Sequence, residues 1–171
     1  GLLKTAVRDN NPVMFFEHKM LYTTKFNDVP EADEDVCIPF GKARIVTEGT
    51  DITVVANSMM TIKAEKAIRK LQKDGVSAEL IDLRTIVPLD TETIVRSVKK
   101  TGKLLIIDEG HVSFGITGEI AARIMPEVFY DLEAPIERMG TSDVPLPFSP
   151  ALEFPLIPDE KKIAAKIRQM V

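Results

Sequence analysis

The chain has 171 residues, which is enough for one hydrophobic core with a few tens of residues beside it. Hydrophobic residues make up 44% and charged residues 28% of the sequence, an ordinary composition for a globular domain. The net charge is −4 and no apolar run approaches the roughly 18 residues of a membrane span, so we expect neither a nucleic-acid surface nor a membrane segment. The single cysteine, Cys37, excludes an intrachain disulfide and fits an intracellular protein. No signal peptide is visible, and because the chain starts at Gly1 rather than Met, we expect it to be part of something longer.

The first 22 residues are predicted to be the end of one unit. A short predicted helix stops at residues 9–12 (DNNP), and its apolar stripe consists of Leu2, Leu3, Ala6 and Val7. The apolar run at 13–16 (VMFF) predicts a buried strand. Residues 23–36 are polar and acidic without a period, which we interpret as a linker.

Strands and helices alternate from residue 37 to residue 171. Strand patterns occur at 43–46, 52–56, 76–83, 103–107 and 135–139, and helix patterns at 61–71, 91–100, 116–129 and 160–170. A proline-rich crossing at 144–158 precedes the last helix, which Asp159 is expected to cap. This alternation predicts an α/β fold with a largely parallel sheet and helices on both faces. A tight turn at 48–51 joins the first two strands, so one edge of the sheet is expected to be antiparallel.

The stretch 103–122 is predicted to contain a strand, an acidic loop at 108–110 and the start of a helix. This helix continues beyond residue 122 and places Ile116, Ile120, Ile124 and Val128 on one face. Binding surfaces of open α/β sheets lie beyond the carboxyl ends of the strands, where this loop falls. His111 with Glu109 is therefore the best acid–base candidate by position, and a polar loop at a domain or subunit contact is the interpretation we favour over it.

Motifs with a defined chemistry are otherwise missing from the sequence. It contains no phosphate-binding, dinucleotide-binding or nucleophile-elbow motif and no His/Cys spacing that is typical of a metal site. A nucleophile would have to be Cys37 or a serine paired with His18 or His111, and no local pattern supports such a pair. We interpret His18 as a structural residue.

Two small clusters offer binding chemistry. Asp9 and Asn11, beside the carbonyl groups that end the first helix, are suited to an all-oxygen cation cage, and the alternative is a plain helix stop. Glu133 and Glu137 flank a short edge strand, where a basic partner could dock by complementary charge, and the alternative is an ordinary acidic surface.

A series of motifs resembles one enzyme family along essentially the whole chain. These motifs are GLLKTAVRDNNPVMFFEHKMLY, EGTDITVVA, ELIDLRTIVPLD, SVKKTGKLLIIDE, FGITGEIAARI and LEAPIERMGTSDVPLPF. Together they resemble the C-terminal part of the beta subunit of thiamine-diphosphate-dependent 2-oxo acid dehydrogenases, the family of the pyruvate, branched-chain 2-oxo acid and acetoin enzymes. FFEHKMLY and IDLRTIVPLD lean toward the branched-chain members and FGITGEIAARI toward the pyruvate members, so the substrate stays open.

The resemblance implies a division of the chain. Residues 1–22 would be the tail of a pyrimidine-binding domain, 23–36 a linker, and 37–171 a transketolase-type C-terminal domain: a three-layer α/β/α sandwich on a five-stranded sheet with one antiparallel edge. Family members hold thiamine diphosphate and magnesium with the alpha subunit and with beta-subunit residues that lie upstream of Gly1. The resemblance therefore implies no catalytic or cofactor-binding residue in this chain, and a location in the bacterial or archaeal cytoplasm or the mitochondrial matrix.

The resemblance also implies partners and two sites. The partners would be an alpha subunit, a second beta subunit and the basic subunit-binding domain of the acyltransferase core. That domain would dock at Glu133, Glu137 and the carboxylate of Val171. A structural potassium ion would bind oxygen atoms of Ala6, Val7, Asp9 and Asn11.

Two rivals remain from the sequence alone. A transketolase or deoxyxylulose-phosphate synthase relative would need phosphate-binding arginines, for which Arg84 and Arg138 are the nearest candidates. A stand-alone binding module would use the same sheet edge for an unrelated ligand.

Overall fold

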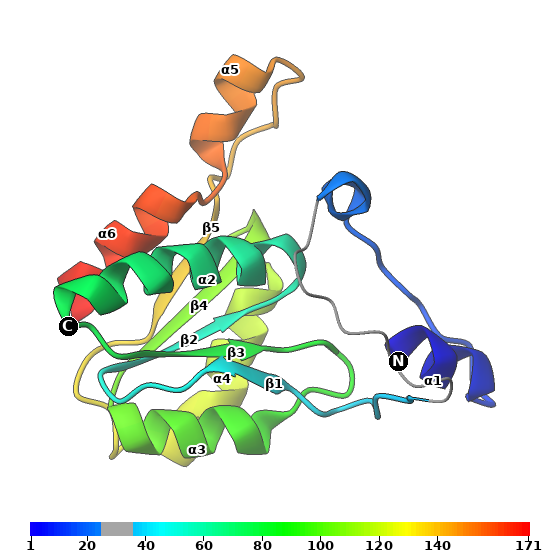
Figure 1. Cartoon of the computed structure of the whole chain (residues 1–171), viewed down its shortest axis with the longest axis horizontal. Coiled ribbons are helices and arrows are strands. Elements are labelled where there is room, and N and C mark those ends of the chain that lie inside the picture. Colours follow the sequence, from blue (N-terminus) through cyan, green and yellow to red (C-terminus); the bar gives the residue numbers. More distant parts are fainter. Residues whose placement is uncertain (25–35) are drawn as a thin grey trace.

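The computed structural model describes residues 1–24 and 36–171, so the predicted linker lies mostly outside the described residues (Figure 1). The α-helices are α1 Leu2–Arg8, α2 Ser58–Leu71, α3 Thr91–Thr101, α4 Ile116–Val128, α5 Pro150–Glu153 and α6 Glu160–Met170. The strands are β1 Arg44–Thr47, β2 Ile52–Ala56, β3 Ala78–Asp82, β4 Leu104–His111 and β5 Glu137–Thr141. Short 3-10 helices occur at Lys19–Thr23, Gln72–Asp74 and Phe154–Leu156.

The five strands form one sheet in the order β1-β3-β2-β4-β5. β2 pairs in parallel with β3 and β4, and β4 with β5, whereas β1 pairs antiparallel with β3. The expected antiparallel edge is therefore confirmed, but β1 does not pair with β2, its neighbour in the chain. The turn between them bonds to the start of β3 instead, since the backbone N–H groups of Thr50 and Asp51 donate to Ser77 O at 2.9 and 2.8 Å.

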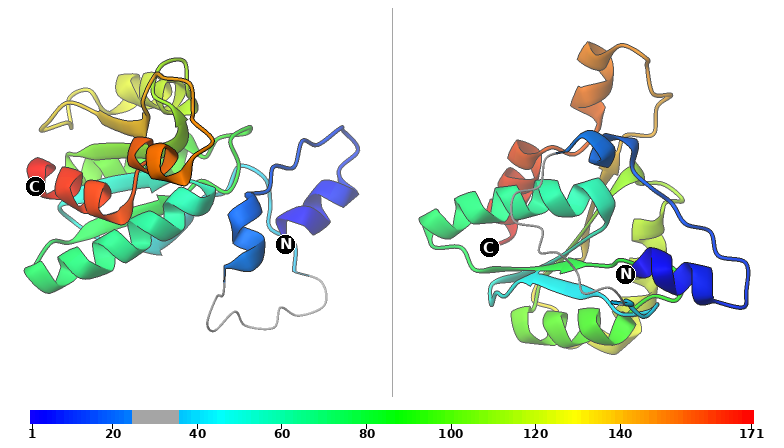
Figure 2. Two further views of the ribbon diagram at one scale, coloured as in Figure 1. Left: turned by 90° about the horizontal axis from the view of Figure 1, so that it is seen from above. Right: turned by 45° about the vertical axis from the view of Figure 1, so that its right-hand side comes forward.

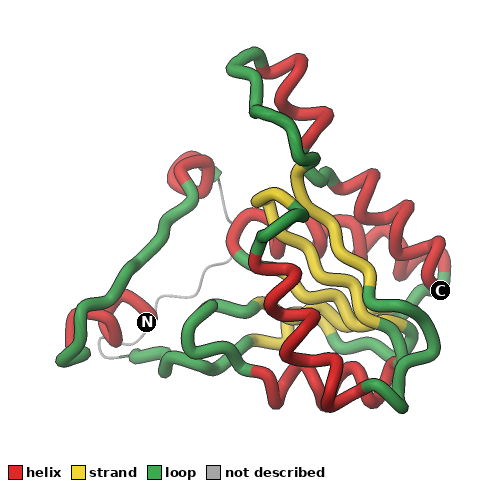
Figure 3. The backbone as a smooth tube through the Cα atoms, turned by 180° about the vertical axis from the view of Figure 1, so that it is seen from behind, coloured by secondary structure: helices red, strands yellow, loops and turns green. Residues whose placement is uncertain are grey.

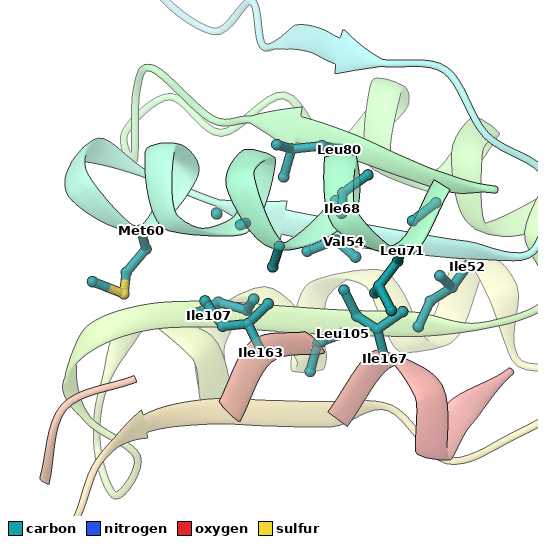
Figure 4. Packing of buried hydrophobic residues seen from close by; sticks show 14 of the residues in the cluster. Ile52, Val54, Met60, Ile68, Leu71, Leu80, Leu105, Ile107, Ile163 and Ile167 are labelled. Carbon is teal, nitrogen blue, oxygen red and sulfur yellow. The ribbon is translucent and has the colours of Figure 1, made fainter. Parts of the chain in front are cut away.

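Helices cover both faces of the sheet, as predicted (Figures 1 and 3). On one face α2 and α6 bury a cluster with β2, β3 and β4, in which Ile163 and Ile167 reach toward Leu105 and Ile107 (Figure 4). On the other face α3 and α4 bury a second cluster. Both layers exclude water from aliphatic side chains, and each such burial contributes about 1.5–3 kcal/mol to folding.

The ends of the helices follow from the capping residues in the sequence. The Asp159 side chain accepts a hydrogen bond from Lys162 N at 2.8 Å, as predicted for the start of α6. Asp90 caps α3 in the same way through Thr93 N at 3.1 Å. α3 ends at Gly102, whose φ of 68° is the left-handed conformation that glycine adopts at low cost.

Two sequence-based expectations are wrong. Residues 13–16 form no strand: Met14 is 80% and Phe16 86% exposed, because within the described residues no strand lies beside this run to pair with it. The predicted acidic loop after Ile107 is a continuation of β4 to His111, which pairs with Thr141 of β5 after an irregularity in the register.

The proline-rich segment between β5 and α6 carries α5 and a 3-10 helix, which the sequence analysis did not predict, and it projects away from the sheet (Figures 1 and 2). Neither short helix contains a buried residue. Among the described residues, none of the helices is both long and apolar enough to cross a membrane.

Candidate functional site

The carboxyl edge of the sheet carries a pair that the sequence analysis did not predict. Glu109 contacts His18 of the N-terminal unit, with 2.6 Å between Oε2 and Nε2, and does not pair with His111. His18 Nδ1 accepts from Met20 N at 3.3 Å, so Nε2 carries the proton that is donated to Glu109. His111 Nδ1 lies 2.8 Å from Ser142 O.

This arrangement makes the carboxyl edge a contact between segments. His18 and Glu109 are 91 positions apart in the sequence, so no local motif could have paired them. Leu21, three positions after His18, packs partly buried against the core that α2 and α6 cover. The interpretation of His18 as a structural histidine agrees with these contacts, because both ring nitrogens are engaged by the protein itself.

The oxygen cluster that follows α1 is compact and exposed. Asp9 Oδ1 accepts from Asn11 N at 2.8 Å and from Asn11 Nδ2 at 3.0 Å, and Asp9 N donates to Ala6 O at 3.4 Å. The hydrogen bonds from the Asn11 backbone and side chain hold the pKa of Asp9 below its ordinary value, so this carboxylate is charged at neutral pH. A carboxylate beside the carbonyl end of a helix is chemically suited to a hard cation. Val7 is exposed at the same helix end.

The amino edge of the sheet holds a polar hollow of about 420 Å³. It is lined by Thr50, Asp51, Lys100, Thr101, Lys103, Glu133 and Val171. Of the three predicted docking residues, the structure brings Glu133 and Val171 together here, while Glu137 lies outside the lining and is 3.4 Å from Lys166 of α6. The sequence analysis missed Asp51, Lys100 and Lys103, which come from different elements and share no motif.

A buried carboxylate lies behind this hollow. The Glu79 side chain is 2% exposed and contacts the ammonium group of Lys100. Glu79 Oε2 also accepts from Gly49 N at 3.3 Å. Burial opposes ionisation of Glu79, but the hydrogen bonds from Lys100, Ser97 and Gly49 outweigh it and lower the pKa of the carboxyl group. A buried glutamate that would be costly alone is therefore kept charged by its partners.

The remaining candidate groups do not converge. Cys37 is exposed, and its Sγ lies 2.8 Å from Arg8 Nη1. Among the described residues no three His, Cys, Asp or Glu side chains are grouped as a metal site would require.

The two arginines that a phosphate-binding rival would need are far apart. Arg84 follows β3 and Arg138 belongs to β5, and β2 and β4 lie between those strands. Three strand spacings separate the two positions by about 14 Å across the sheet. Arg138 Nη1 donates to Val112 O at 3.1 Å. The backbone carbonyl of Val112 thus already engages Arg138.

The fold defined by these elements is an open three-layer α/β/α domain with a short N-terminal unit held at its carboxyl edge. The family described as transketolase, C-terminal domain, matches residues 41–163. The chain belongs to this family. A solved structure of a "split gene transketolase, inactive beta4 tetramer" has a TM-score of 0.66 and 26% identity, and the match covers 83% of this chain and 45% of that one.

Curated relatives extend the similarity beyond the matched domain. The chain is 46% identical over 170 residues to the pyruvate dehydrogenase E1 component subunit beta of Rickettsia felis, which covers 99% of this chain and 51% of that protein. It is 42% identical to the 2-oxoisovalerate dehydrogenase subunit beta of Bacillus subtilis, with 99% and 52% covered. Identity to the acetoin:2,6-dichlorophenolindophenol oxidoreductase subunit beta of Cupriavidus necator is 43%, with 99% and 49% covered. The chain thus spans about half the length of the curated relatives it matches.

Proposed function

We propose that this chain is the C-terminal half of the beta subunit of a 2-oxo acid dehydrogenase and serves as its assembly domain. The similarity to three such beta subunits over 99% of the chain supports this most, because it extends into the 40 residues that precede the matched family domain. The identities of 46, 42 and 43% are too close to choose among the substrates of these relatives.

In this proposal the chemistry belongs to the upstream half of the beta subunit and to the alpha subunit. Thiamine diphosphate with magnesium would be held there, and the whole enzyme would decarboxylate a 2-oxo acid and transfer the acyl group to a lipoyl arm. The present chain would support that site without touching the substrate. The proposed location is the bacterial or archaeal cytoplasm or the mitochondrial matrix, which fits relatives from bacteria and relatives named mitochondrial.

Exposed apolar side chains support an assembly role. On the N-terminal unit they include Leu3, Val7, Met14, Phe16 and Met20, and on the projecting segment 142–158 they include Val144, Leu146, Phe148, Leu152 and Phe154. Apolar surface gathered on two projecting segments is typical of protein contacts. We assign these surfaces to contacts with the upstream half, the alpha subunit and a second beta subunit, and residues 1–22 to the tail of the pyrimidine-binding domain.

Co-expression tests this assignment. The chain produced together with the upstream half and the alpha subunit is expected to appear in native mass spectrometry as a complex with both. Replacing Phe16 and Phe148 with serine should weaken that complex, whereas replacing the exposed Lys73, in the 3-10 helix Gln72–Asp74 that follows α2, should not. A chain that stays monomeric beside both partners would refute the assembly role and favour a stand-alone binding module.

A structural potassium ion is the second element of the proposal. Backbone oxygens of Ala6 and Val7 and oxygens of Asp9 and Asn11 would supply part of its shell, and upstream residues the rest. Potassium is expected to raise the melting temperature of the full-length subunit, and Asp9→Ala to abolish that rise while leaving the melting temperature in sodium unchanged. A potassium effect that survives Asp9→Ala would place the ion elsewhere.

Docking of the acyltransferase is the third element. A basic subunit-binding domain would be attracted to Glu133, Glu137 and Val171 at the amino edge of the sheet. Reversing the charge of Glu133 and Glu137 together is expected to raise the dissociation constant, most strongly in low salt. An unchanged dissociation constant would exclude this surface.

A transketolase-type activity is the alternative, because the solved relative with a TM-score of 0.66 carries that name. The higher identity of the chain to the three beta subunits, 42–46% against 26% for the transketolase structure, argues against it. Assay of the co-expressed complex with a sugar phosphate and with a 2-oxo acid would separate the two activities.

A further inference from the structure

The charges that line the amino-edge hollow pose a problem for the proposed docking. Two side-chain carboxylates, Asp51 and Glu133, and the carboxylate of Val171 line the hollow together with two ammonium groups, Lys100 and Lys103. Counted in this way, the hollow has a net charge of only −1 and would offer a basic partner little attraction.

The two lysines differ in what lies behind them. Lys100 stands in the last turn of α3, with 41% of its side chain exposed, and its ammonium group contacts the carboxylate of Glu79 beneath it. A second carboxylate, Glu48 in the β1–β2 turn, is 3.5 Å away. Glu79 is almost completely buried, so a partner at the hollow cannot touch it and can sense it only through Lys100.

The buried carboxylate of Glu79 changes the electrostatic field that a partner meets at the hollow. The field of an ammonium group paired closely with a carboxylate falls off as that of a dipole, so at the partner's distance Lys100 contributes little net positive charge. The carboxylates of Asp51, Glu133 and Val171 then outnumber the one remaining cation, Lys103. Asp51 Oδ2 is held in place by a hydrogen bond from Ser77 N at 2.8 Å.

We propose that Glu79 is a specificity-determining residue: a buried carboxylate that cancels the charge of Lys100 and thereby lets the hollow between Asp51 and Glu133 attract a basic partner domain. This inference rests on the docking surface proposed above. It adds a residue that the partner never contacts and that surface inspection would not select.

Three variants of the full-length beta subunit, assembled with its alpha subunit, test the inference by titration with a recombinant acyltransferase subunit-binding domain. Glu79→Gln uncovers the charge of Lys100 and is expected to weaken binding about two- to fivefold in low salt. Lys100→Gln removes that charge and is expected to tighten binding by a similar factor. The double variant should bind as the unmodified protein does.

Asp90→Asn is the matched control. Asp90 is also buried and accepts hydrogen bonds from Ala43 N and Thr93 N at 2.9 and 3.1 Å, so its replacement removes one buried carboxylate and costs stability in the same way. It lies ten positions before Lys100 at the other end of α3, about 15 Å away, beyond the screening length of physiological salt. Binding by Asp90→Asn should be unchanged.

The outcomes separate this inference from the docking proposal. If charge reversal at Glu133 and Glu137 weakens binding but Glu79→Gln does not, the docking surface stands and the counter-charge role of Glu79 is refuted. If charge reversal has no effect either, both are refuted. Should Glu79→Gln fail to fold, Lys100→Gln still decides the matter, because binding that is unchanged or weaker in that variant contradicts the inference.

Discussion

Replacing Lys100 with methionine would test how far the buried Glu79 depends on its partner. Methionine keeps most of the length and apolar stem of lysine but leaves Glu79, 2% exposed, without its cation. Removing one partner of a fully buried ion pair costs about 3–5 kcal/mol. Lys100 is 41% exposed and Gly49 N still donates to Glu79, so we expect a smaller loss of about 2–3 kcal/mol in the free energy of unfolding at neutral pH.

The pH dependence of the unfolding free energy tests the role of Lys100 more sharply than the size of the loss at neutral pH. In the unmodified chain the pKa of Glu79 is below its ordinary value, so the stability that the charged form contributes is complete above about pH 4.5 and is lost as the pH falls through the lowered pKa. In Lys100→Met, burial is no longer outweighed, and the pKa of Glu79 should rise above its ordinary value. The variant then recovers stability relative to the unmodified chain as acid protonates Glu79.

Urea unfolding of both proteins between neutral pH and about pH 4.5 measures this difference. We expect the gap in unfolding free energy to narrow as the pH falls, and the double variant Glu79→Gln/Lys100→Met to show no such narrowing. A gap below about 0.5 kcal/mol at neutral pH, the level of an ordinary surface substitution, would refute the reasoning. So would a gap that widens in acid.

Three further predictions concern the fold. Gly49→Ala should lower the free energy of unfolding by more than about 2 kcal/mol, because the added Cβ would lie 2.2 Å from a backbone carbon of β3. Gly75→Ala should lower it by only about 1 kcal/mol, because the added Cβ meets open space and the cost comes from the φ of 86°. Chemical denaturation of the two variants measures both losses. His18→Ala removes the contact with Glu109 and should speed proteolysis within residues 1–24 without changing the melting temperature of the core. Ile167→Ala, fully buried under α6, should cost about 2–5 kcal/mol by the same denaturation assay, and a loss below about 1 kcal/mol would contradict the packing.

The sequence predicted the helices and parallel strands well because their signals are local. The stripe that contains Ile120 and Ile124 and the cap at Asp159 each define an element within a few residues. The wrong strand at 13–16 has a physical cause too. An apolar run becomes a strand only when a neighbouring strand satisfies its backbone, and the described residues provide none there.

The candidate sites were less predictable than the fold. Glu133 and Val171 could be proposed for one surface from the family resemblance, but Lys100 and its buried partner Glu79 come together only through packing of α3 on the sheet. His18 and Glu109 likewise meet across 91 positions. Contacts of this kind depend on the tertiary arrangement, and no spacing in the sequence encodes them.

Turnover of a 2-oxo acid by the purified chain, alone and after assembly with the upstream half and the alpha subunit, tests the central claim most directly. The account predicts no decarboxylation and no tight binding of thiamine diphosphate by the chain alone, and activity only in the assembled complex. Decarboxylation by the chain in the absence of every other protein would contradict it.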